Sequence, residues 1–239
     1  MSALHRFFVG PDAVQGDRAT LAGDQAKQIA DVLRLGSGER VVLVRDGEET
    51  LVRLDVVGRS GVEGAVVGRH ACLAEPKVRV TLALPLLRGD RSEEVVEAVT
   101  QLGVSRIVPF TSERSVAREL SDAKRGRWER IARGSAETAR RGRVPEIVPL
   151  VAWSELFDLV DPPVLVAWEG EHERRMRGEV PVDADRLSLV IGPEGGLTPN
   201  EIAFARARGA AIVTLGSRNL RSETAALAAV SQLFALVEP

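Results

Sequence analysis

The sequence has few residues that could cross-link the chain or hold a metal ion. Its 239 residues include one cysteine, Cys72, and three histidines that lie far apart, His5, His70 and His172. One cysteine cannot form a disulfide within a chain, and histidines without close spacing do not make the usual zinc site. We therefore expect a protein with no metal and no disulfide framework.

Long apolar runs are also missing. The longest are strand-sized, whereas a membrane-spanning helix needs roughly 20 apolar residues. The opening segment, Met1 to Val9, has no apolar core followed by a small-residue cleavage site, as a secretory signal would. We expect a cytoplasmic protein without a membrane partner.

Positive charge is concentrated in one segment, although the net charge is only -2. Between Arg114 and Arg143 there are ten basic and four acidic residues. Such a cluster can bind phosphate groups, or it can be the solvated face of a helix. Charge alone does not separate these interpretations.

Two parts of the chain follow different patterns. In residues 1–73, short apolar segments at 41–44, 51–57 and 64–71 predict strands, and Asp46-Gly47 predicts a tight hairpin turn. Apolar residues at helical spacing predict one helix over 24–35. This part is therefore expected to be a small β-barrel.

After a boundary at 74–76, strand and helix patterns alternate through residues 77–239. Such alternation predicts an α/β fold with a parallel sheet covered on both faces. The expected strands are 78–84, 106–110, 164–168, 187–191 and 211–215, and the expected helices are 93–102, 122–141, 154–160, 199–208 and 223–237.

The segment 189–201 reads LVIGPEGGLTPNE, a strand, a glycine-rich turn and a helix start. Thr198 is a good N-cap, Pro199 suits the first helical position, and Glu201 completes a capping box. A glycine turn after a parallel strand is where α/β proteins bind ligands. Neither the P-loop nor the dinucleotide fingerprint is present, so the ligand is not expected to be held by its phosphates. A tight turn without a ligand is the alternative.

A second strand, ending near Leu215, is followed by a polar loop and a helix of small residues, LGSRNLRSETA at 215–225. Ser222 could cap this helix, and Glu223 is favoured at its positive end. For Glu223, a position favoured by the helix dipole is the alternative to a role in chemistry. For Arg218 and Arg221, the alternative is exposure at the surface without a function.

Together the two segments resemble the SPOUT methyltransferases, with GPEGGLT followed by LGxRxLRxETA. Within that superfamily the chain is most similar to the ribosomal RNA small subunit methyltransferase E family, which methylates N3 of a uridine. Further blocks match in the same order: 5–9 (HRFFV), 32–34 (VLR), Gly38-Glu39, 101–104 (QLGV), 112–115 (SERS), Ala136-Glu137, Arg141 and Pro145. The chain departs from the family pattern at Gln28, Arg88, Thr138 and Asn219.

The resemblance implies an N-terminal PUA-like RNA-binding β-barrel and a C-terminal SPOUT domain whose parallel sheet carries a deep trefoil knot. The knotted S-adenosylmethionine site would span about 165–227. Its cofactor-binding residues would be Ala167, Trp168, Glu169, Ile191, Gly192, Pro193, Glu194, Gly195, Gly196, Leu215, Gly216, Ser217, Asn219, Leu220, Arg221, Thr224 and Ala225.

Catalysis at uridine N3 requires loss of an imide proton, and a nearby cation stabilises the resulting anion. The candidates are Arg221, Arg141 and Arg114, and whether Glu194 or Glu223 acts as a base is open. Phe7 and Phe8 are interpreted as core residues, with base stacking as the alternative. The resemblance implies RNA contacts from Arg6, Arg34, Arg88, Arg91, Arg114 and Arg141.

The implied partners are small-subunit ribosomal RNA, free or in the 30S subunit, and a second copy of the chain. Helix 225–237 suits a homodimer interface or the core of one chain equally well. Two rival functions remain: methylation of a ribose 2'-hydroxyl in ribosomal or transfer RNA, and RNA binding without catalysis in ribosome assembly.

Overall fold

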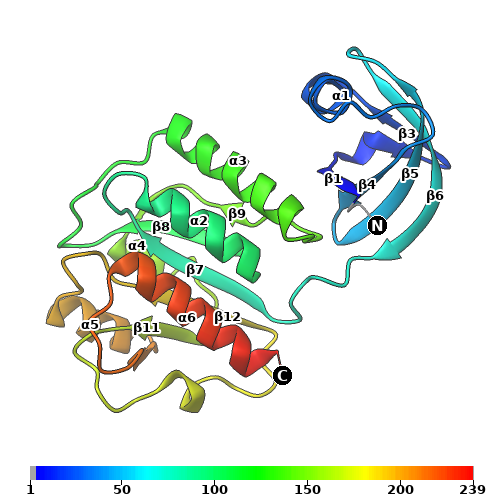
Figure 1. The fold of residues 1–239 in the computed structure, drawn as a ribbon. Coiled ribbons are helices and arrows are strands. Elements are labelled where there is room, and N and C mark those ends of the chain that lie inside the picture. Colours follow the sequence, from blue (N-terminus) through cyan, green and yellow to red (C-terminus); the bar gives the residue numbers. More distant parts are fainter. Residues whose placement is uncertain (1–3, 239) are drawn as a thin grey trace. The chain divides into compact units, whose positions relative to one another are not determined.

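The structure, a computed structural model, describes residues 4–238. The chain forms two compact units (Figure 1). The N-terminal unit consists of Met1–Glu75 with Ala136–Arg143, and the C-terminal unit consists of Pro76–Ser135 with Val144–Pro239.

The N-terminal unit is built on a six-stranded sheet in the order β1-β4-β5-β6-β3-β2. All its strand pairs are antiparallel except β1 with β4. The buried Phe7 packs in its core and Phe8 is also buried, which confirms the interpretation of both as core residues. The strands are β1 (His5–Phe8), β2 (Val14–Gln15), β3 (Arg18–Leu21), β4 (Arg40–Arg45), β5 (Glu48–Val57) and β6 (Val62–Ala71), with the short 3-10 helix η1 (Pro11–Ala13) before β2.

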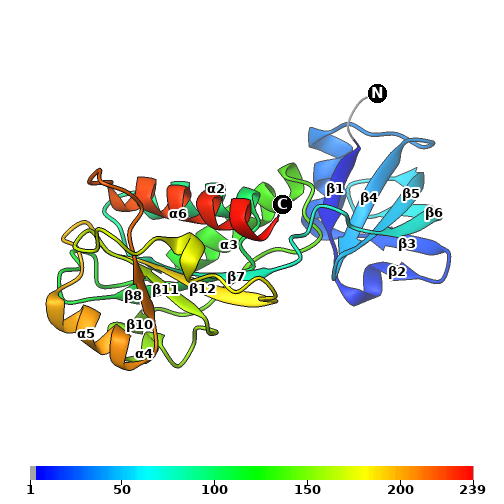
Figure 2. The ribbon, with the colours of Figure 1, turned by 90° about the horizontal axis from the view of Figure 1, so that it is seen from below.

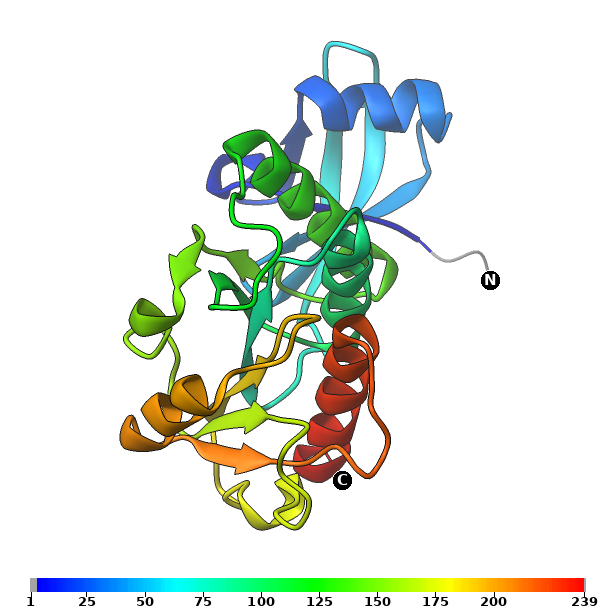
Figure 3. The same ribbon diagram turned by 90° about the vertical axis from the view of Figure 1, so that its left-hand side faces the viewer.

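Local sequence explains two features of this unit. The predicted turn joins β4 to β5, and both Asp46 and Gly47 have positive φ, as this class of hairpin turn requires. The predicted helix is α1 (Gly23–Lys27) continued by a wider π-helical turn, η2 (Gln28–Val32). It buries Ala26 and Ile29 in the core of this unit. Figure 3 shows the helix, in blue, lying across the strands of the sheet.

The segment 136–143 joins the N-terminal unit, which the predicted boundaries of 1–73 and 77–239 did not include. It contains the last turn of α3 (Asp122–Thr138) and the residues after it. The helix ends before the predicted limit of 141 because Arg140 adopts a left-handed conformation at φ 57°. The Arg141 N–H then donates to the Ala136 carbonyl at 2.8 Å, a typical helix end. Gly142 pairs with the β4–β5 turn through a bond from the Gly47 N–H at 3.0 Å.

The C-terminal unit contains the predicted parallel sheet, in the order β10-β8-β7-β12-β11-β13, with β9 also on β8. Every pairing in it is parallel. The two-residue strands β9 and β10 were not predicted. The strands are β7 (Arg79–Pro85), β8 (Arg106–Thr111), β9 (Glu146–Ile147), β10 (Val151–Ala152), β11 (Val164–Ala167), β12 (Arg186–Ile191) and β13 (Ala211–Val213).

Alternate side chains of these strands enter two cores, because successive residues of a strand point to opposite faces. Leu82 of β7 and Leu189 of β12 join the core under α2, α3 and α6, whereas Ala83 and Val190 join the core over α4 and α5. Figure 2 shows these two helical layers on opposite faces of the sheet. The helices are α2 (Arg91–Leu102), α4 (Trp153–Leu156), α5 (Pro199–Ala207) and α6 (Ser222–Val237), with the 3-10 helix η3 (Met176–Gly178).

Helix α6 packs into the core of its own chain. Ala226, Ala229, Val230 and Leu233 are fully buried, and the helix lies along α2 and over β12. No helix within residues 4–238 has both the length and the apolar character that crossing a bilayer requires.

Candidate functional site

Three neighbouring parallel strands end level with one another. Ala167 at the end of β11 pairs with Ile191 of β12 on one side and with Val213 of β13 on the other. Carboxyl ends of adjacent parallel strands place their following loops together. The loops after these strands therefore emerge side by side.

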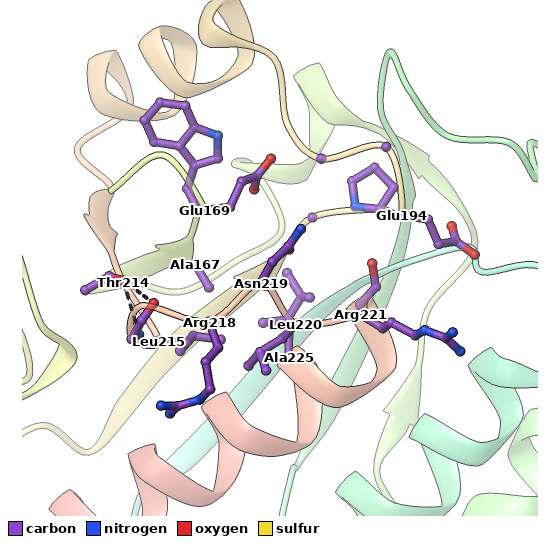
Figure 4. A pocket seen from close by; sticks show the side chains of 18 of the residues that line it. Ala167, Glu169, Glu194, Thr214, Leu215, Arg218, Asn219, Leu220, Arg221 and Ala225 are labelled. Carbon is purple, nitrogen blue, oxygen red and sulfur yellow. Dashed lines mark hydrogen bonds between the residues drawn. The ribbon is translucent and has the colours of Figure 1, made fainter. Parts of the chain in front are cut away.

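The loops enclose a cavity of about 620 Å³ (Figure 4). That volume lies in the range of small-molecule and cofactor sites. The cavity is lined by Arg91, Ala167, Trp168, Glu169, Ile191, Gly192, Pro193, Glu194, Gly195, Gly196, Thr214, Leu215, Gly216, Arg218, Asn219, Leu220, Arg221, Ser222 and Ala225.

The glycine turn after β12 is packed too tightly for side chains. A Cβ on Gly195 would lie 2.8 Å from the Cβ of Arg114, and a Cβ on Gly196 would collide with the carboxylate of Glu169. Gly196 also has φ +70°, a conformation that disfavours other residues. The turn therefore presents bare backbone to the cavity.

The predicted capping box fixes where this turn ends. The Glu201 N–H donates to the Thr198 hydroxyl at 3.3 Å, and the Thr198 N–H donates to the Glu201 carboxylate at 2.8 Å. The second carboxylate oxygen of Glu201 accepts from the Glu113 N–H at 2.8 Å. One buried carboxylate thus ties the start of α5 to the loop after β8.

The loop after β13 offers unpaired backbone. Gly216 has φ +118°, and its N–H donates to the Thr214 hydroxyl at 3.2 Å. The backbone groups of 217–220 make no hydrogen bond within the described part of the chain. Polar backbone groups that line a cavity normally find a partner, and here a ligand can supply it.

The start of α6 differs from the prediction. Helix α6 begins at Ser222 itself, with Arg221 as its N-cap residue, and no side chain caps it. The prediction that Ser222 caps this helix is wrong, because Ser222 already has helical geometry and is buried beside the cavity.

The third wall comes from the loop after β11. The Trp168 N–H donates to the Val213 carbonyl at 3.1 Å, and its indole N–H donates to the Leu197 carbonyl at 3.2 Å. Trp168 therefore links this loop to both of the others. In Figure 4 the Asn219 side chain points across the cavity toward Glu169, so an amide and a carboxylate face the same space.

Charged groups gather at the α2 side of the cavity. The Arg91 guanidinium lies 3.9 Å from the Glu194 carboxylate and 3.8 Å from that of Glu223. Glu194 also accepts a hydrogen bond from the Arg88 N–H at 3.1 Å. The second oxygen of Glu223 is buried without a hydrogen-bond partner. In Figure 4, Arg218 and Arg221 leave their loop in different directions.

The structure brings most of the predicted cofactor residues to one cavity. Ser217 and Thr224 are the exceptions, since both are exposed and neither lines it. Sequence reasoning missed Thr214, Arg218 and Ser222 as lining residues. The hydroxyl at the end of a strand was the available signal for Thr214, and surface exposure was one of the alternatives left open for Arg218, which is exposed and also lines the cavity.

The candidate arginines have different surroundings. The Arg114 guanidinium donates to the Gly195 carbonyl at 3.1 Å, which places it at the glycine turn. Arg88 and Arg114 are exposed residues of the C-terminal unit, and Arg91 is half-buried. Arg34, in the N-terminal unit, is exposed and has a positive φ of 53°.

Arg6 and Arg141 lie in the N-terminal unit and are both paired there. The Arg141 side chain is 2% exposed and donates to both oxygens of Glu75, at 3.1 and 3.0 Å. The Arg6 side chain is 8% exposed and forms a 2.8 Å ion pair with Glu49. These pairs give both arginines a structural role, and their predicted roles toward RNA stay predictions.

The chain has relatives among known proteins. The sequence profile of the RNA methyltransferase domain family matches residues 74–234. The ribosomal RNA small subunit methyltransferase E of Mycobacterium bovis is 33% identical over 94% of this chain and 88% of its own length. The chain belongs to the ribosomal RNA small subunit methyltransferase E family.

Other relatives agree. The Bacillus subtilis protein is 28% identical over 96% of both chains. The structure of the Neisseria gonorrhoeae enzyme bound to S-adenosyl methionine matches with a TM-score of 0.88 and 27% identity, covering 98% of each chain. A Legionella pneumophila methyltransferase in complex with the same cofactor has a TM-score of 0.86 and 26% identity, again over 98% of each chain. The fold is therefore the SPOUT fold of this family.

Proposed function

We propose that the protein methylates N3 of a uridine in small-subunit ribosomal RNA, with S-adenosylmethionine as the methyl donor. The observation that carries the proposal is the cavity formed by the loops after β11, β12 and β13, with its bare glycine turn and unpaired backbone. Two relatives of the same fold are described as bound to this cofactor, and the named relatives are small-subunit ribosomal RNA methyltransferases.

The residues present fit the cofactor. The unpaired backbone of 218–220 can pair with a flat heterocycle, as backbone groups do in many cofactor sites. The Glu169 carboxylate makes no hydrogen bond among the described residues and can accept from ribose hydroxyls. Gly195 and Gly196 leave the space that a side chain would fill. S-adenosylmethionine, when bound, supplies a methyl group already activated on a sulfonium.

The chain's own residues have two tasks in the transfer. They must orient the uracil so that N3 is in line with the methyl group, since alignment supplies much of the rate. They must also favour loss of the N3 proton, because the neutral imide is a poor nucleophile. Arg221 at the cavity edge would stabilise the developing negative charge. Arg114, held at the glycine turn, would place a second cation beside it.

Two carboxylates are available to accept the proton. Glu194 lines the cavity, but the Arg88 N–H and Arg91 hold it in place. Glu223 has one buried oxygen free of hydrogen bonds and lies beside Arg91. A base must also reach the proton that it accepts, and Glu223 does not line the cavity, so neither carboxylate is assigned as the base.

The proposal extends to the setting of the reaction. The protein would act in the cytoplasm as a homodimer, with a deep trefoil knot formed by the loops of the cavity. The N-terminal unit would be a PUA-like RNA-binding module contributing Arg6 and Arg34. Its RNA substrate would be small-subunit ribosomal RNA, either free or assembled in the 30S subunit.

Mass mapping of small-subunit ribosomal RNA from cells with and without the protein tests this function. We expect a base-methylated uridine that disappears when the gene is deleted and returns on incubation with the protein and S-adenosylmethionine. A ribose 2'-O-methyl product would establish the rival chemistry. Failure of calorimetry to detect cofactor binding would favour RNA binding without catalysis.

A further inference from the structure

The N-terminal unit has a cavity of its own. It measures about 170 Å³, and one side is lined by Leu43 and Arg45 of β4, Glu48 and Thr50 of β5 and Arg69 of β6. Thr50 pairs in register with Leu43 on one side and with Arg69 on the other, so these side chains share one face of the sheet. Drug-sized ligands occupy sites of about 300–1,000 Å³. This smaller cavity, which we call the β-sheet pocket, therefore has room for a single ring system.

The rest of the lining comes from the segment that joins the edge strands β1 and β2. Val9 and Val14 give it apolar surface, and Gly10 lies between them. Gly10 has a φ of -79°, which any residue can adopt, and a Cβ there would meet nothing within 4 Å. Neither the backbone conformation nor a packing neighbour therefore requires glycine at this position. A larger side chain here would have the free space of the pocket to enter.

Thr50 places a buried hydroxyl in the β-sheet pocket. The residue is only 5% exposed, and its hydroxyl makes no hydrogen bond within residues 4–238. Val52 and Leu54, which share its face of β5, belong to the apolar core of this unit. A hydroxyl at the end of such an apolar row costs free energy unless it finds a partner. A polar group bound in the pocket can supply that partner.

The charged groups of the pocket are kept apart from one another. Arg45 and Glu48 lie directly opposite across the β4–β5 hairpin, where opposite charges usually attract, yet no ion pair joins them in the described part of the chain. Arg45 instead donates to the Pro11 carbonyl at 3.1 Å, and Arg69 donates to the Gly16 carbonyl. These bonds hold both guanidinium groups and leave further N–H donors on each. The Glu48 carboxylate has no partner among the described residues, so its oxygens are open acceptors.

The balance of charge favours a neutral ligand. Arg45 and Arg69 carry two positive charges, while Glu48 and Asp46, which lies 3.7 Å from Arg45, carry two negative charges. A phosphate gains little from a cluster whose charges cancel. A nucleobase suits it better, because unstacked bases pack on apolar side chains and guanidinium planes and pair through their edges. Guanine offers O6 and N7 to an arginine and N–H donors to a carboxylate, whereas the carbonyl oxygens of uracil would be repelled by that carboxylate.

We propose that the β-sheet pocket binds one unstacked guanine of the substrate RNA. The proposal rests on the proposed function for the identity of the RNA. The Glu48 carboxylate and the Thr50 hydroxyl pair with the polar edge of the base, the arginines donate to its acceptors, and the valines contact its ring. The N-terminal unit thereby reads one base of the substrate, in addition to any contact that it makes with phosphates.

The test measures binding of the full chain to short RNAs that differ in one base. A uridine nonamer is compared with nonamers that carry guanine, adenine or cytosine at the centre, by fluorescence anisotropy. We expect the guanine nonamer to bind roughly tenfold more tightly than the uridine nonamer, since one well-formed base contact discriminates by about this factor. Equal affinity for all four nonamers would overturn the proposal. Free guanosine 5'-monophosphate that binds as tightly as the guanine nonamer would also overturn it, because the ligand would then be a free nucleotide.

Two single variants connect the preference to the pocket. Thr50→Val removes a hydroxyl that has no protein partner and keeps a residue that suits a strand, so the fold should be retained. Glu48→Gln removes the exposed carboxylate. Each variant should lose most of the preference for guanine while S-adenosylmethionine affinity is unchanged. Thr20→Val and Glu63→Gln are the matched controls, because they remove the same groups from exposed positions of the same sheet and should keep the preference.

A third variant blocks the pocket without removing a polar group. Gly10→Leu places a side chain where the structure has free space, and its backbone needs no change. We expect thermal stability to be maintained while the preference for guanine is lost. A preference that survives in Thr50→Val, Glu48→Gln and Gly10→Leu alike would place guanine recognition elsewhere and overturn the proposal. If the protein prefers the guanine nonamer but methylates no small-subunit ribosomal RNA, the proposed function fails and the pocket assignment stands.

Discussion

Gly195 lies directly against Arg114: a Cβ at position 195 would be 2.8 Å from the Arg114 Cβ, while the Arg114 guanidinium donates to the Gly195 carbonyl. The glycine turn and the loop after β8 therefore fix one another's position. The close packing and the hydrogen bond to the Gly195 carbonyl together hold the Arg114 guanidinium at the edge of the cavity, although Gly195 has no side chain.

Replacing Gly195 should consequently disturb cofactor binding. Valine at this position would push the turn into the cavity or away from Arg114, and we expect at least a ~100-fold loss of S-adenosylmethionine affinity, or about 2.7 kcal/mol. Calorimetry measures it. Gly68→Val is the control, because nothing lies within 4 Å of a Cβ there and β6 tolerates valine. Unchanged affinity in the Gly195 variant would remove the turn from the binding site.

The proposed role of Arg221 is in the methyl-transfer step and not in cofactor binding. Its side chain makes no hydrogen bond or ion pair in the described structure, so Arg221→Ala should fold normally. We expect kcat to fall by roughly 10²–10³-fold, as when a group that stabilises a developing anion is removed. Cofactor affinity should change much less. Single-turnover methylation assays, with Arg206→Ala as control, measure the effect; normal turnover would exclude Arg221 from catalysis.

Arg141 should matter first for stability. Its guanidinium is buried and paired with Glu75, and removing one partner of a buried ion pair costs about 3–5 kcal/mol. We expect a loss in this range for Arg141→Ala in urea unfolding. Pairing Arg141→Met with Glu75→Leu, which leaves no unpaired charge, should recover part of it. If that folded double variant still methylates RNA, a catalytic role for Arg141 is excluded.

The N-terminal unit should become less stable in acid, because Glu49 loses its charge there. Burial acts to raise the pKa of this carboxyl, but hydrogen bonds from Arg6, Cys72 and His70 outweigh it and lower the pKa below its ordinary value of 4.5. A lowered pKa means that the charged form stabilises the fold above about pH 4.5 and that this contribution is lost as pH falls through the folded-state value.

Glu49→Gln tests this dependence. The variant should be less stable than the parent protein at pH 7, and the difference should shrink as pH is lowered below about 4.5. Urea unfolding between pH 7 and pH 3 measures both. A difference that stays constant over this range would show that the charge of Glu49 does not contribute.

Sequence alone predicted the main strands and helices of the C-terminal unit. Strands buried on both faces read as short apolar runs, so β7, β8, β11, β12 and β13 were found, whereas the two-residue β9 and β10 carry no such pattern. The capping box at Thr198 was predicted because Thr198 and Glu201 are only three residues apart and bond to each other.

Features that depend on distant partners could not be predicted. Glu75 and Arg141 are 66 residues apart, and nothing local to Arg141 shows that it is buried. The helical spacing of the apolar residues predicted that α3 extends to 141. The sequence does not show that Arg140 adopts the left-handed conformation that ends the helix. The candidate cofactor residues came from resemblance to a family, and their convergence on one cavity followed from strand order, which no single segment encodes.

The return of residues 136–143 to the N-terminal unit affects how this protein is made. The Gly47 N–H and the Glu75 carboxylate find their partners at Gly142 and Arg141. Translation delivers those partners only after α2, β8 and α3 have been synthesised. The N-terminal unit on the nascent chain therefore lacks these partners until then, and a fragment cut after residue 75 would leave the Gly47 N–H and the Glu75 carboxylate without them.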